Sequence, residues 1–315
     1  IMFLTLGGSH AYGTNVEGSD IDIRGCFFTP RSALLGSQNV EQVENHSTDT
    51  VIYAFNKLVS LCEACNPNTI ELLGGKPEHY IMVHPLGKEF IDNRKMFLSR
   101  RAVHSFGGYA NQQLRRLENA LARDKYEQRR QEEHIAASCL FAMNAFASKY
   151  SDFEDGSIRL SIDKSDKADM DVEIFMDVDL HHYPMRDYKA IWSELNNIVK
   201  DYGKLNGRNK KKEDAHLNKH AMHLVRLYLM CFDILEKEEV ITYREKDIPE
   251  LMAIRNGKYQ KSDGTFRDEF FEMIDEYEKR MKYAAENTSL PDKPDHKKIE
   301  EWVISVNEKV IKNEI

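Results

Sequence analysis

The stretch of residues 7–22 constrains the fold of this chain more than any other segment. It reads GGSHAYGTNVEGSDID and follows the apolar run of residues 1–6. Apolar runs bounded by glycine-rich turns are typical of strands, so the pattern predicts a strand, a tight turn, a loop and a second strand. In that second strand Asp20 and Asp22 would point to the same side, because the side-chain period of a strand is two.

The residue types in this stretch suit an anionic ligand and a hard cation. Gly8 lacks a Cβ and lets the backbone approach a ligand closely, and Ser9 adds a hydroxyl and an N–H that can face phosphate oxygens. Asp20 and Asp22, held together without a basic partner, would repel each other. Mg²⁺ would remove this repulsion, since it takes oxygen ligands and keeps substrate phosphates in its shell. A glycine-rich hairpin with solvated aspartates is the alternative.

Several strings of the sequence resemble a known family. The Gly-Gly-Ser turn followed by Asp-Ile-Asp resembles the polymerase-β-type nucleotidyltransferases. The resemblance is sharper to one branch, the RlaP-like group named for RNA-repair gene neighbourhoods, and spans residues 3–260. The strings that carry it are GGSHAYG, SDIDIRG and NPNTIELL, then residues 106–110, 219–227 and 251–257.

The resemblance implies a chemistry for these residues. In that superfamily the glycine-serine turn, here Gly8 and Ser9, holds a nucleoside triphosphate, and the paired aspartates hold Mg²⁺, with Mn²⁺ as a second choice. A third carboxylate on a neighbouring strand shares the metal and accepts the proton of the attacking hydroxyl. Asp49, at the start of a short β-branched run, fits that role, with a plain loop aspartate as the alternative. ATP is the expected nucleotide, and pyrophosphate the product.

The expected fold class is α+β. We expect a polymerase-β-like nucleotidyltransferase domain with a mixed sheet over residues 1–100, and a mostly helical domain over residues 101–285. Alternating apolar residues predict a β-hairpin near 157–180 within the second domain. Residues 286–315 should form a linker and a last helix. Family members often carry a helix before the first strand, and none is visible here, so the sheet should be less covered at that end.

A helix predicted over residues 214–236 carries three histidines on one face, and Lys219 and Arg226 flank them. His216 and His223 would lie about 10 Å apart, too far for one zinc ion to bind all three histidines. We therefore expect this helix to line the active cleft. Lys219 and Arg226 would contact the nucleotide phosphates and His220 or His223 would make polar contacts, whereas a purely structural helix is the alternative.

A basic segment between residues 94 and 130 stands out in an acidic protein. The chain has 44 Lys and Arg against 52 Asp and Glu, a formal charge of −8, so it is not a globally basic nucleic-acid binder. The segment nevertheless holds ten basic residues against three acidic ones. Contact of RNA phosphates with Arg115, Arg116, Arg129 and Arg130 is one interpretation, and a solvated helix face with i,i+4 ion pairs is the other.

Other features of the sequence exclude other classes of protein. Five widely spaced cysteines argue against a disulfide framework, and the C-x-x-C at residues 62–65 is expected to be two core thiols of a helix. A second D-x-D, Asp177 and Asp179, lacks a glycine-serine turn and is interpreted as a solvated strand face. No apolar run approaches the roughly 18 residues of a membrane span, and no signal peptide is visible, so we expect a cytoplasmic protein.

These features together predict a metal-dependent nucleotidyltransferase. It would move an NMP from an NTP to an acceptor hydroxyl, with an RNA end as the favoured acceptor because of the basic segment. Transfer to a protein or small-molecule hydroxyl is the second hypothesis. A nucleotide-binding sensor without activity is the third, and the intact set of Ser9, Asp20, Asp22 and Asp49 argues against it. The residues leave the nucleobase, the acceptor and the oligomeric state open.

Overall fold

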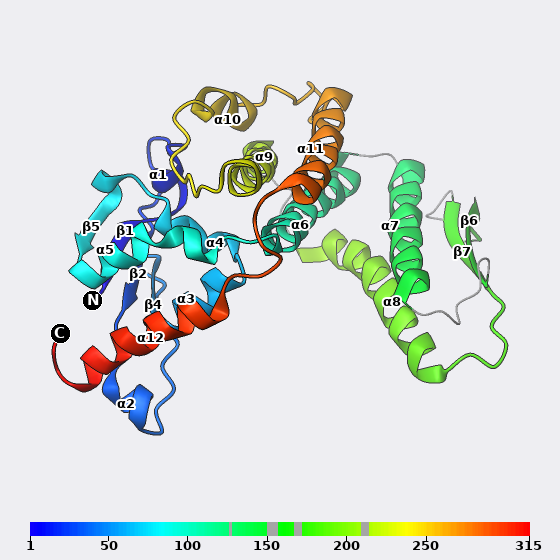
Figure 1. Ribbon diagram of the computed structural model, residues 1–315. Coiled ribbons are helices and arrows are strands. Elements are labelled where there is room, and N and C mark those ends of the chain that lie inside the picture. The colour runs from blue at the N-terminus through cyan, green and yellow to red at the C-terminus, as the bar shows by residue number, and fades with distance from the viewer. Residues whose placement is uncertain (126–127, 150–156, 167–171, 209–213) are drawn as a thin grey trace. The chain divides into compact units, whose positions relative to one another are not determined.

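A computed structural model describes residues 1–125, 128–149, 157–166, 172–208 and 214–315 (Figure 1). The described chain is α+β, as predicted: a mixed sheet forms near the N-terminus, and a mostly helical region with a two-stranded hairpin follows it. The chain divides into two compact units. Unit 1 comprises Ile1–Leu114, Asn218–Tyr259 and Arg267–Ile315, and unit 2 comprises Arg115–Leu217 and Gln260–Phe266. These divisions differ from the expected boundaries at residues 100 and 285.

Within the described residues, five strands form the sheet of unit 1. They are β1 (Phe3–Leu6), β2 (Ile23–Phe27), β3 (Gln42–Asn45), β4 (Thr50–Ala54) and β5 (Tyr80–Val83). Their order is β3-β4-β2-β1-β5, and only the β2–β4 pair is parallel. Strand β1 lies between β2 and β5 and contributes the fully buried Phe3, which explains why the first apolar run was recognisable.

Short helices connect and cover these strands. They are α1 (Gly8–Tyr12), α2 (Arg31–Leu35), α3 (Phe55–Glu63), α4 (Pro67–Ile70) and α5 (Pro85–Asp92), with 3₁₀ turns η1 (Glu71–Leu73), η2 (Pro77–His79) and η3 (Arg94–Phe97). The buried residues of α3 include Leu58 and Cys62, which recur at helical spacing. The stretch thus forms one amphipathic helix with its apolar face in the core.

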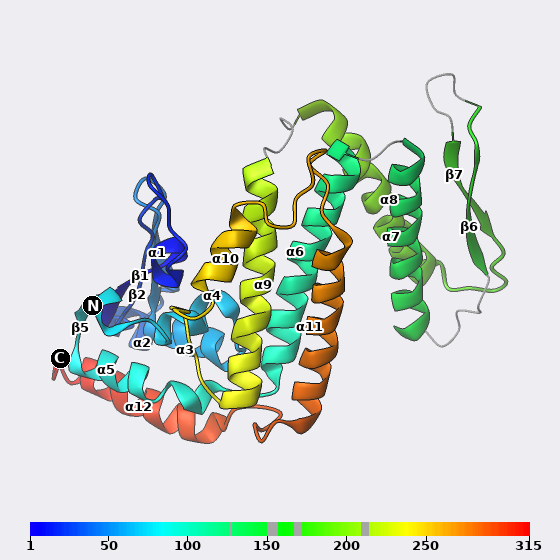
Figure 2. The ribbon, with the colours of Figure 1, turned by 90° about the horizontal axis from the view of Figure 1, so that it is seen from above.

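The last helix, α12 (His296–Ile311), packs on the sheet half of unit 1. Trp302 lies with its ring 5.2 Å from those of Phe55 and Phe90, and its indole N–H donates to Glu89 at 2.7 Å. Figure 2 shows α12 running beside α5. The chain end therefore belongs to the same compact unit as the first hundred residues.

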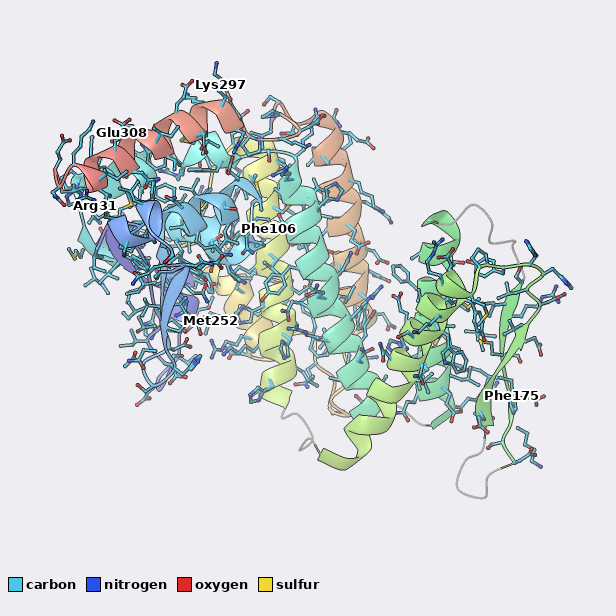
Figure 3. The ribbon with its side chains drawn as sticks, turned by 90° about the horizontal axis from the view of Figure 1, so that it is seen from below. Arg31, Phe106, Phe175, Met252, Lys297 and Glu308 are labelled. Carbon is cyan, nitrogen blue, oxygen red and sulfur yellow. The ribbon has the colours of Figure 1, made fainter. Side chains whose placement is uncertain are left out.

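The helical half of unit 1 consists of the first part of α6 (Arg101–Lys125), most of α9 (Asp214–Lys237), α10 (Ile248–Arg255) and α11 (Asp268–Asn287). In Figure 2, α9, α6 and α11 run side by side. Phe106, labelled in Figure 3, is buried on α6. The rings of Tyr228 on α9 and Tyr277 on α11 lie 5.9 Å apart. Nearly every residue from Ala221 to Leu235 is buried, so α9 is the central helix of this half.

Unit 2 holds α7 (Gln128–Lys149), α8 (Met185–Arg208) and the antiparallel strands β6 (Ile158–Lys164) and β7 (Val172–Val178). The hairpin is confirmed: Ile158 pairs with Val178, and Ile158 also joins the buried core of this unit. Asp177 and Asp179 are exposed, which agrees with a solvated strand face.

The structure agrees with the sequence analysis on the burial of the cysteines and on membrane spans, and differs from it on the position of Cys65. All five cysteines are buried and free in the described chain. Cys62 lies in α3, whereas Cys65 lies just beyond its end with a left-handed φ of 50°, so only one of the two thiols is helical. Among the described residues, every helix is too short or too polar to cross a bilayer.

Candidate active site

One edge of the sheet collects the predicted turn and two of the predicted carboxylates. Leu6 at the end of β1 pairs with Ile23 at the start of β2, and Ile23 pairs with Thr50 at the start of parallel β4. The residues just outside these pairs therefore meet: the Gly7 N–H donates to the Asp22 carbonyl at 2.8 Å, and the Ile23 N–H donates to the Asp49 carbonyl at 3.3 Å. Strand pairing thus brings Asp22 and Asp49 together from positions far apart in the sequence.

The glycine-serine segment is a short helix rather than the expected tight turn. Helix α1 runs from Gly8 to Tyr12 and is followed by Gly13, which has a left-handed φ of 73°. Gly8 has φ of 54°, and a Cβ there would lie 1.8 Å from an Asp22 carboxylate oxygen. Gly8 is therefore required by the neighbouring carboxylate, a contact that the sequence did not reveal. The half-buried Ser9 hydroxyl has no hydrogen-bond partner in the described part of the chain, so it is available to a ligand.

The carboxylates have a basic partner, contrary to the expectation from the sequence. The Arg24 guanidinium lies 3.2 Å from Asp22 and 3.1 Å from Asp49 and bridges them. It also donates to the backbone carbonyl of Asp49. Arg24 follows Asp22 by two residues, so both side chains lie on the same side of an extended segment. The repulsion that was expected to require a cation is thus partly balanced within the protein.

The two carboxyl groups of this cluster have pKa values shifted in opposite directions. Partial burial, and then the neighbouring Asp49, raise the pKa of Asp22 to about 6, against the opposing effect of Arg24. A hydrogen bond with Asp22 lowers the pKa of Asp49, and Arg24 adds to that effect. One guanidinium faces two carboxylates, so a net negative charge is left at this edge above pH 6.

Asp20 is placed apart from this pair. Its side chain is exposed and makes no hydrogen bond or ion pair within the described residues, although its charge helps to raise the pKa of Asp22. In the described parts of the chain no three His, Cys, Asp or Glu side chains gather as a metal site. Asp22 and Asp49 nevertheless offer hard oxygen donors on a half-open surface, and this donor set suits Mg²⁺ or Mn²⁺ once the guanidinium moves away.

Arg226 is not available to nucleotide phosphates, which corrects the expectation for α9. Its side chain is buried and pairs with the buried Glu71 at 3.0 Å. The Tyr12 hydroxyl donates to the other Glu71 oxygen at 2.7 Å, and the Arg226 guanidinium lies 3.6 Å above the Tyr12 ring. Tyr12 ends α1, so this buried network fastens α1 to α9 and η1.

The other predicted residues of α9 have different exposures. Lys219 is exposed, and His220 is half-buried. His223 packs edge-on against Tyr12 with ring centres 6.4 Å apart. Burial, and then the charges of Arg226 and Lys219, lower the pKa of His223 to about 3, so its imidazole is neutral at physiological pH. Of this set, Lys219 is the one fully exposed cation.

The four predicted RNA-binding arginines lie on the surface of unit 2. Arg115 lies over the ring of the exposed Phe141 at 4.5 Å, and Arg129 pairs with Glu133 at 3.3 Å, one helical turn away. Arg116 and Arg130 are also exposed. The i,i+4 pairing expected of a solvated helix is therefore present for Arg129, and all four side chains remain accessible.

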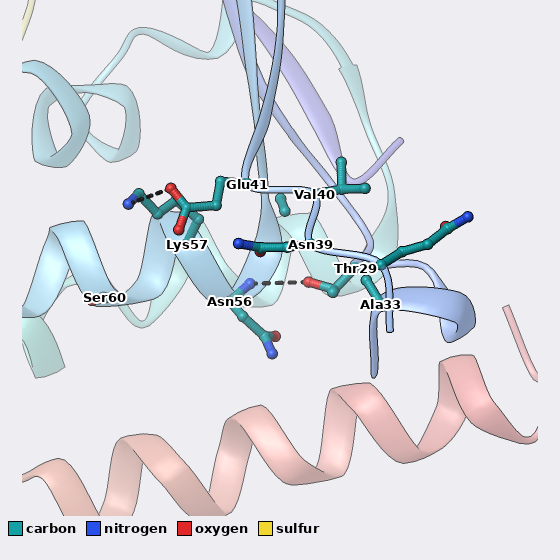
Figure 4. A pocket seen from close by; sticks show the side chains of 10 residues that line it. Thr29, Ala33, Asn39, Val40, Glu41, Asn56, Lys57 and Ser60 are labelled. Carbon is teal, nitrogen blue, oxygen red and sulfur yellow. Dashed lines mark hydrogen bonds and ion pairs between the residues drawn. The ribbon is translucent and has the colours of Figure 1, made fainter. Parts of the chain in front are cut away.

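A pocket of about 330 Å³ lies at the opposite end of the sheet (Figure 4). Its lining includes Thr29, Glu41, Asn56 and Lys57, of which Lys57 and Glu41 form an ion pair of 2.8 Å. Thr29 follows β2, Asn56 and Lys57 follow β4, and Glu41 precedes the antiparallel β3, whereas Asp22 precedes β2. The pocket is therefore separate from the carboxylate edge.

The comparison with known proteins identifies the N-terminal part of the chain. Residues 1–150 match the family model described as RlaP, the RNA repair pathway DNA polymerase beta family. Residues 1–150 belong to the RlaP family. Membership of the polymerase beta family implies a nucleotidyltransferase that acts on a nucleotide, and members generally use divalent metals. The RlaP match contains the entire sheet edge with Gly8, Asp22, Arg24 and Asp49. No curated protein and no solved structure shows a significant match.

Proposed function

We propose that this protein transfers an NMP from an NTP to an acceptor hydroxyl, with ATP as the expected nucleotide and an RNA end as the expected acceptor. The observation that carries the proposal is the meeting of Asp22 and Asp49 beside Gly8 and Ser9, inside the RlaP match. A like-charged pair next to an unpartnered serine hydroxyl suits a polyphosphate brought in with a divalent cation.

The divalent cation, Mg²⁺ or Mn²⁺, would be held by Asp22 and Asp49, with Asp20 as a third ligand. When bound, it would neutralise charge on the triphosphate and polarise the reacting oxygen. Gly8 and Ser9 bind the β- and γ-phosphates, and the free Ser9 hydroxyl donates to them. Arg24 contacts one oxygen of each carboxylate, so its guanidinium has to move aside where the cation takes those oxygens.

The reaction at the bound triphosphate is an in-line displacement. The acceptor oxygen forms a bond to the α-phosphorus, and the bond from that phosphorus to the oxygen bridging to the β-phosphate breaks, so pyrophosphate leaves. Asp49 accepts the hydroxyl proton, because its side chain is 58% exposed and can be reached by an acceptor, whereas that of Asp22 is 17% exposed.

A labelling experiment tests this function. The protein is incubated with each α-labelled NTP and Mg²⁺, with and without a short RNA, and the labelled species is identified. Label on RNA, lost in Asp22→Asn, is the expected result. Label on the protein or on a small molecule would support the second hypothesis, and no label with any NTP would contradict nucleotidyl transfer.

Salt dependence tests the RNA acceptor separately. RNA bound through lysines and arginines releases counterions, so log K should fall with log salt by about 0.7 per phosphate contact. Neutralising Arg115, Arg116, Arg129 and Arg130 should reduce that slope by about 1–3 units if two to four of them touch phosphate. NTP binding should persist in this variant. An unchanged slope would leave the four arginines as a solvated face.

A further inference from the structure

The carboxylate edge continues past α1 toward β5. Tyr80 at the start of β5 pairs with Thr5 of β1, and the Thr5 hydroxyl donates to the carbonyl of His79 at 3.3 Å. The order along this edge is therefore Asp49, Asp22, the Gly8–Ser9 segment and then His79. The glycine-serine segment therefore lies between the two carboxylates and the side chains around His79.

Three side chains gather at this far end, and we call them the Lys76 cluster: Lys76, His79 and Tyr243. The Lys76 ammonium lies 3.5 Å from the centre of the Tyr243 ring, and the His79 ring meets Tyr243 edge-on at 5.5 Å. Tyr243 in turn packs on the end of α1, because a Cβ at Gly13 would lie 2.6 Å from its ring. The cluster thus rests against the same short helix that begins with Gly8 and Ser9.

The cluster has unused capacity for an anion. Lys76 forms no ion pair with a carboxylate in the described part of the chain. The Nδ1 atom of His79 is buried and has no hydrogen-bond partner there. Partial burial and then the Lys76 charge lower the pKa of His79; His10 acts in the same direction, and Glu78 opposes it. All three cluster residues are half-buried, so a ligand can reach them.

We infer that the Lys76 cluster binds the terminal phosphate of the nucleoside triphosphate, an inference that rests on the proposed function. A substrate whose α-phosphorus lies at Asp22 and Asp49, and whose β- and γ-phosphates lie along Gly8 and Ser9, extends its terminal phosphate toward the cluster. A lysine ammonium is a compact charge with three donors and suits a terminal phosphate. Lys76 supplies a positive charge for the phosphate, a role that Arg226 cannot take because it is buried against Glu71.

Binding measurements on the whole chain test this inference. Calorimetric titrations with Mg²⁺ and NTP, NMP or inorganic tripolyphosphate are compared for the wild type and Lys76→Gln. The Kd of NTP and of tripolyphosphate should rise about tenfold in the variant, the size expected for one charge-assisted contact. The Kd of NMP should not change. KM for NTP should rise more than kcat falls, and Lys76→Arg should restore part of the affinity.

Lys95→Gln, at an exposed lysine of η3, is the matched control and should bind like the wild type. Thermal unfolding of each variant confirms folding. Equal NTP affinity in Lys76→Gln, or equal loss for NMP and NTP, would overturn the inference. Weakened RNA binding with NTP affinity intact would assign the cluster to an acceptor phosphate and also overturn it. If the wild type binds no NTP, the proposed function fails as well; if it binds and transfers while Lys76→Gln is unaltered, only this inference fails.

Discussion

Two arginine–carboxylate groups in unit 1 use similar contacts in opposite surroundings. At the sheet edge, Arg24 lies 3.1–3.2 Å from Asp22 and Asp49, and the three side chains are 17–58% exposed. In the interior, Arg226 lies 3.0 Å from Glu71, and both are less than a tenth exposed. The distances are nearly equal, so the difference lies in charge balance and in access to water.

The charge balance separates the two roles. Arg226 and Glu71 cancel, and Tyr12 satisfies the second Glu71 oxygen, so the buried group is complete. At the edge, one guanidinium faces two carboxylates, and a negative charge is left where solvent and ligands can reach it. A buried ion pair with balanced charges stabilises the fold, because removing one partner leaves the other charge buried and unpaired. An exposed unbalanced group can exchange its partner, which is what a site for a cation and a polyphosphate requires.

The largest expected effect comes from removing the surplus charge. Asp49→Asn leaves one carboxylate for the one guanidinium at the sheet edge, the same ratio as in the interior pair. It should lower kcat about 10²–10⁴-fold, the usual contribution of a general base. NTP affinity should change about threefold or less, because Asp49 acts mainly on the hydroxyl while Asp20 and Asp22 still hold the cation. Single-turnover kinetics measure the effect on the chemical step, and equilibrium binding measures the effect on NTP affinity. The exposed double variant Asp177→Asn/Asp179→Asn should retain activity; the opposite ranking would refute the assignment.

The interior pair should respond in stability instead. Arg226→Met leaves Glu71 buried without a cation and should cost about 3–5 kcal/mol of unfolding free energy. Replacing both partners, as in Glu71→Leu/Arg226→Met, should recover a large part of that loss. Urea denaturation of the two variants measures the effect. A loss of under about 1 kcal/mol for Arg226→Met would show that water reaches the pair and would remove the contrast with Arg24.

Acid should weaken the interior region selectively through His223. The pKa of this half-buried imidazole is lowered to about 3, against about 6.5 when unfolded. The unfolded chain therefore binds a proton that the folded chain refuses, so stability falls as pH falls from 6.5 toward 3. Between pH 7 and 5 the wild type should lose about 1–2 kcal/mol more than His223→Gln. His216→Gln, exposed on the same helix, should follow the wild type; identical curves for all three would contradict this burial.

The contrast also explains which parts of the molecule were predictable. Local periodicity predicted β1 and the β6–β7 hairpin, because one face of each is more buried than the other, and a long run of helical spacing predicted α9. The pairing of Asp22 with Asp49 depends on the parallel β2–β4 contact, and only the family resemblance suggested it. Arg24 could have been noticed, since it follows Asp22 at the strand period of two. The burial of Arg226 could not, because its partner Glu71 is 155 residues away. Charged residues on a helix flank look alike until the tertiary contact is known.

The smallest expected effect concerns Arg24 itself and tests whether the edge exchanges its partner. The guanidinium contacts one oxygen each of Asp22 and Asp49, so Arg24 and a divalent ion held by the same carboxylates compete. Arg24→Gln should increase Mn²⁺ affinity in the absence of nucleotide about tenfold, since a like charge within about 4 Å of the site is removed. Its unfolding free energy should change by about 1 kcal/mol or less, because the pair is partly solvated. Titration of Mn²⁺ by electron paramagnetic resonance measures the affinity.

Two further variants make this measurement decisive. Arg24→Lys keeps the charge but loses the planar fork that reaches both carboxylates, so its Mn²⁺ affinity should lie between the wild type and Arg24→Gln. Asp22→Asn in the Arg24→Gln background should abolish the gain, because it removes an oxygen donor of the ion. Weaker Mn²⁺ binding in Arg24→Gln would mean that Arg24 holds the carboxylates in place for the ion. In that case Arg24 would resemble Arg226, and the distinction between the two groups would rest on exposure alone.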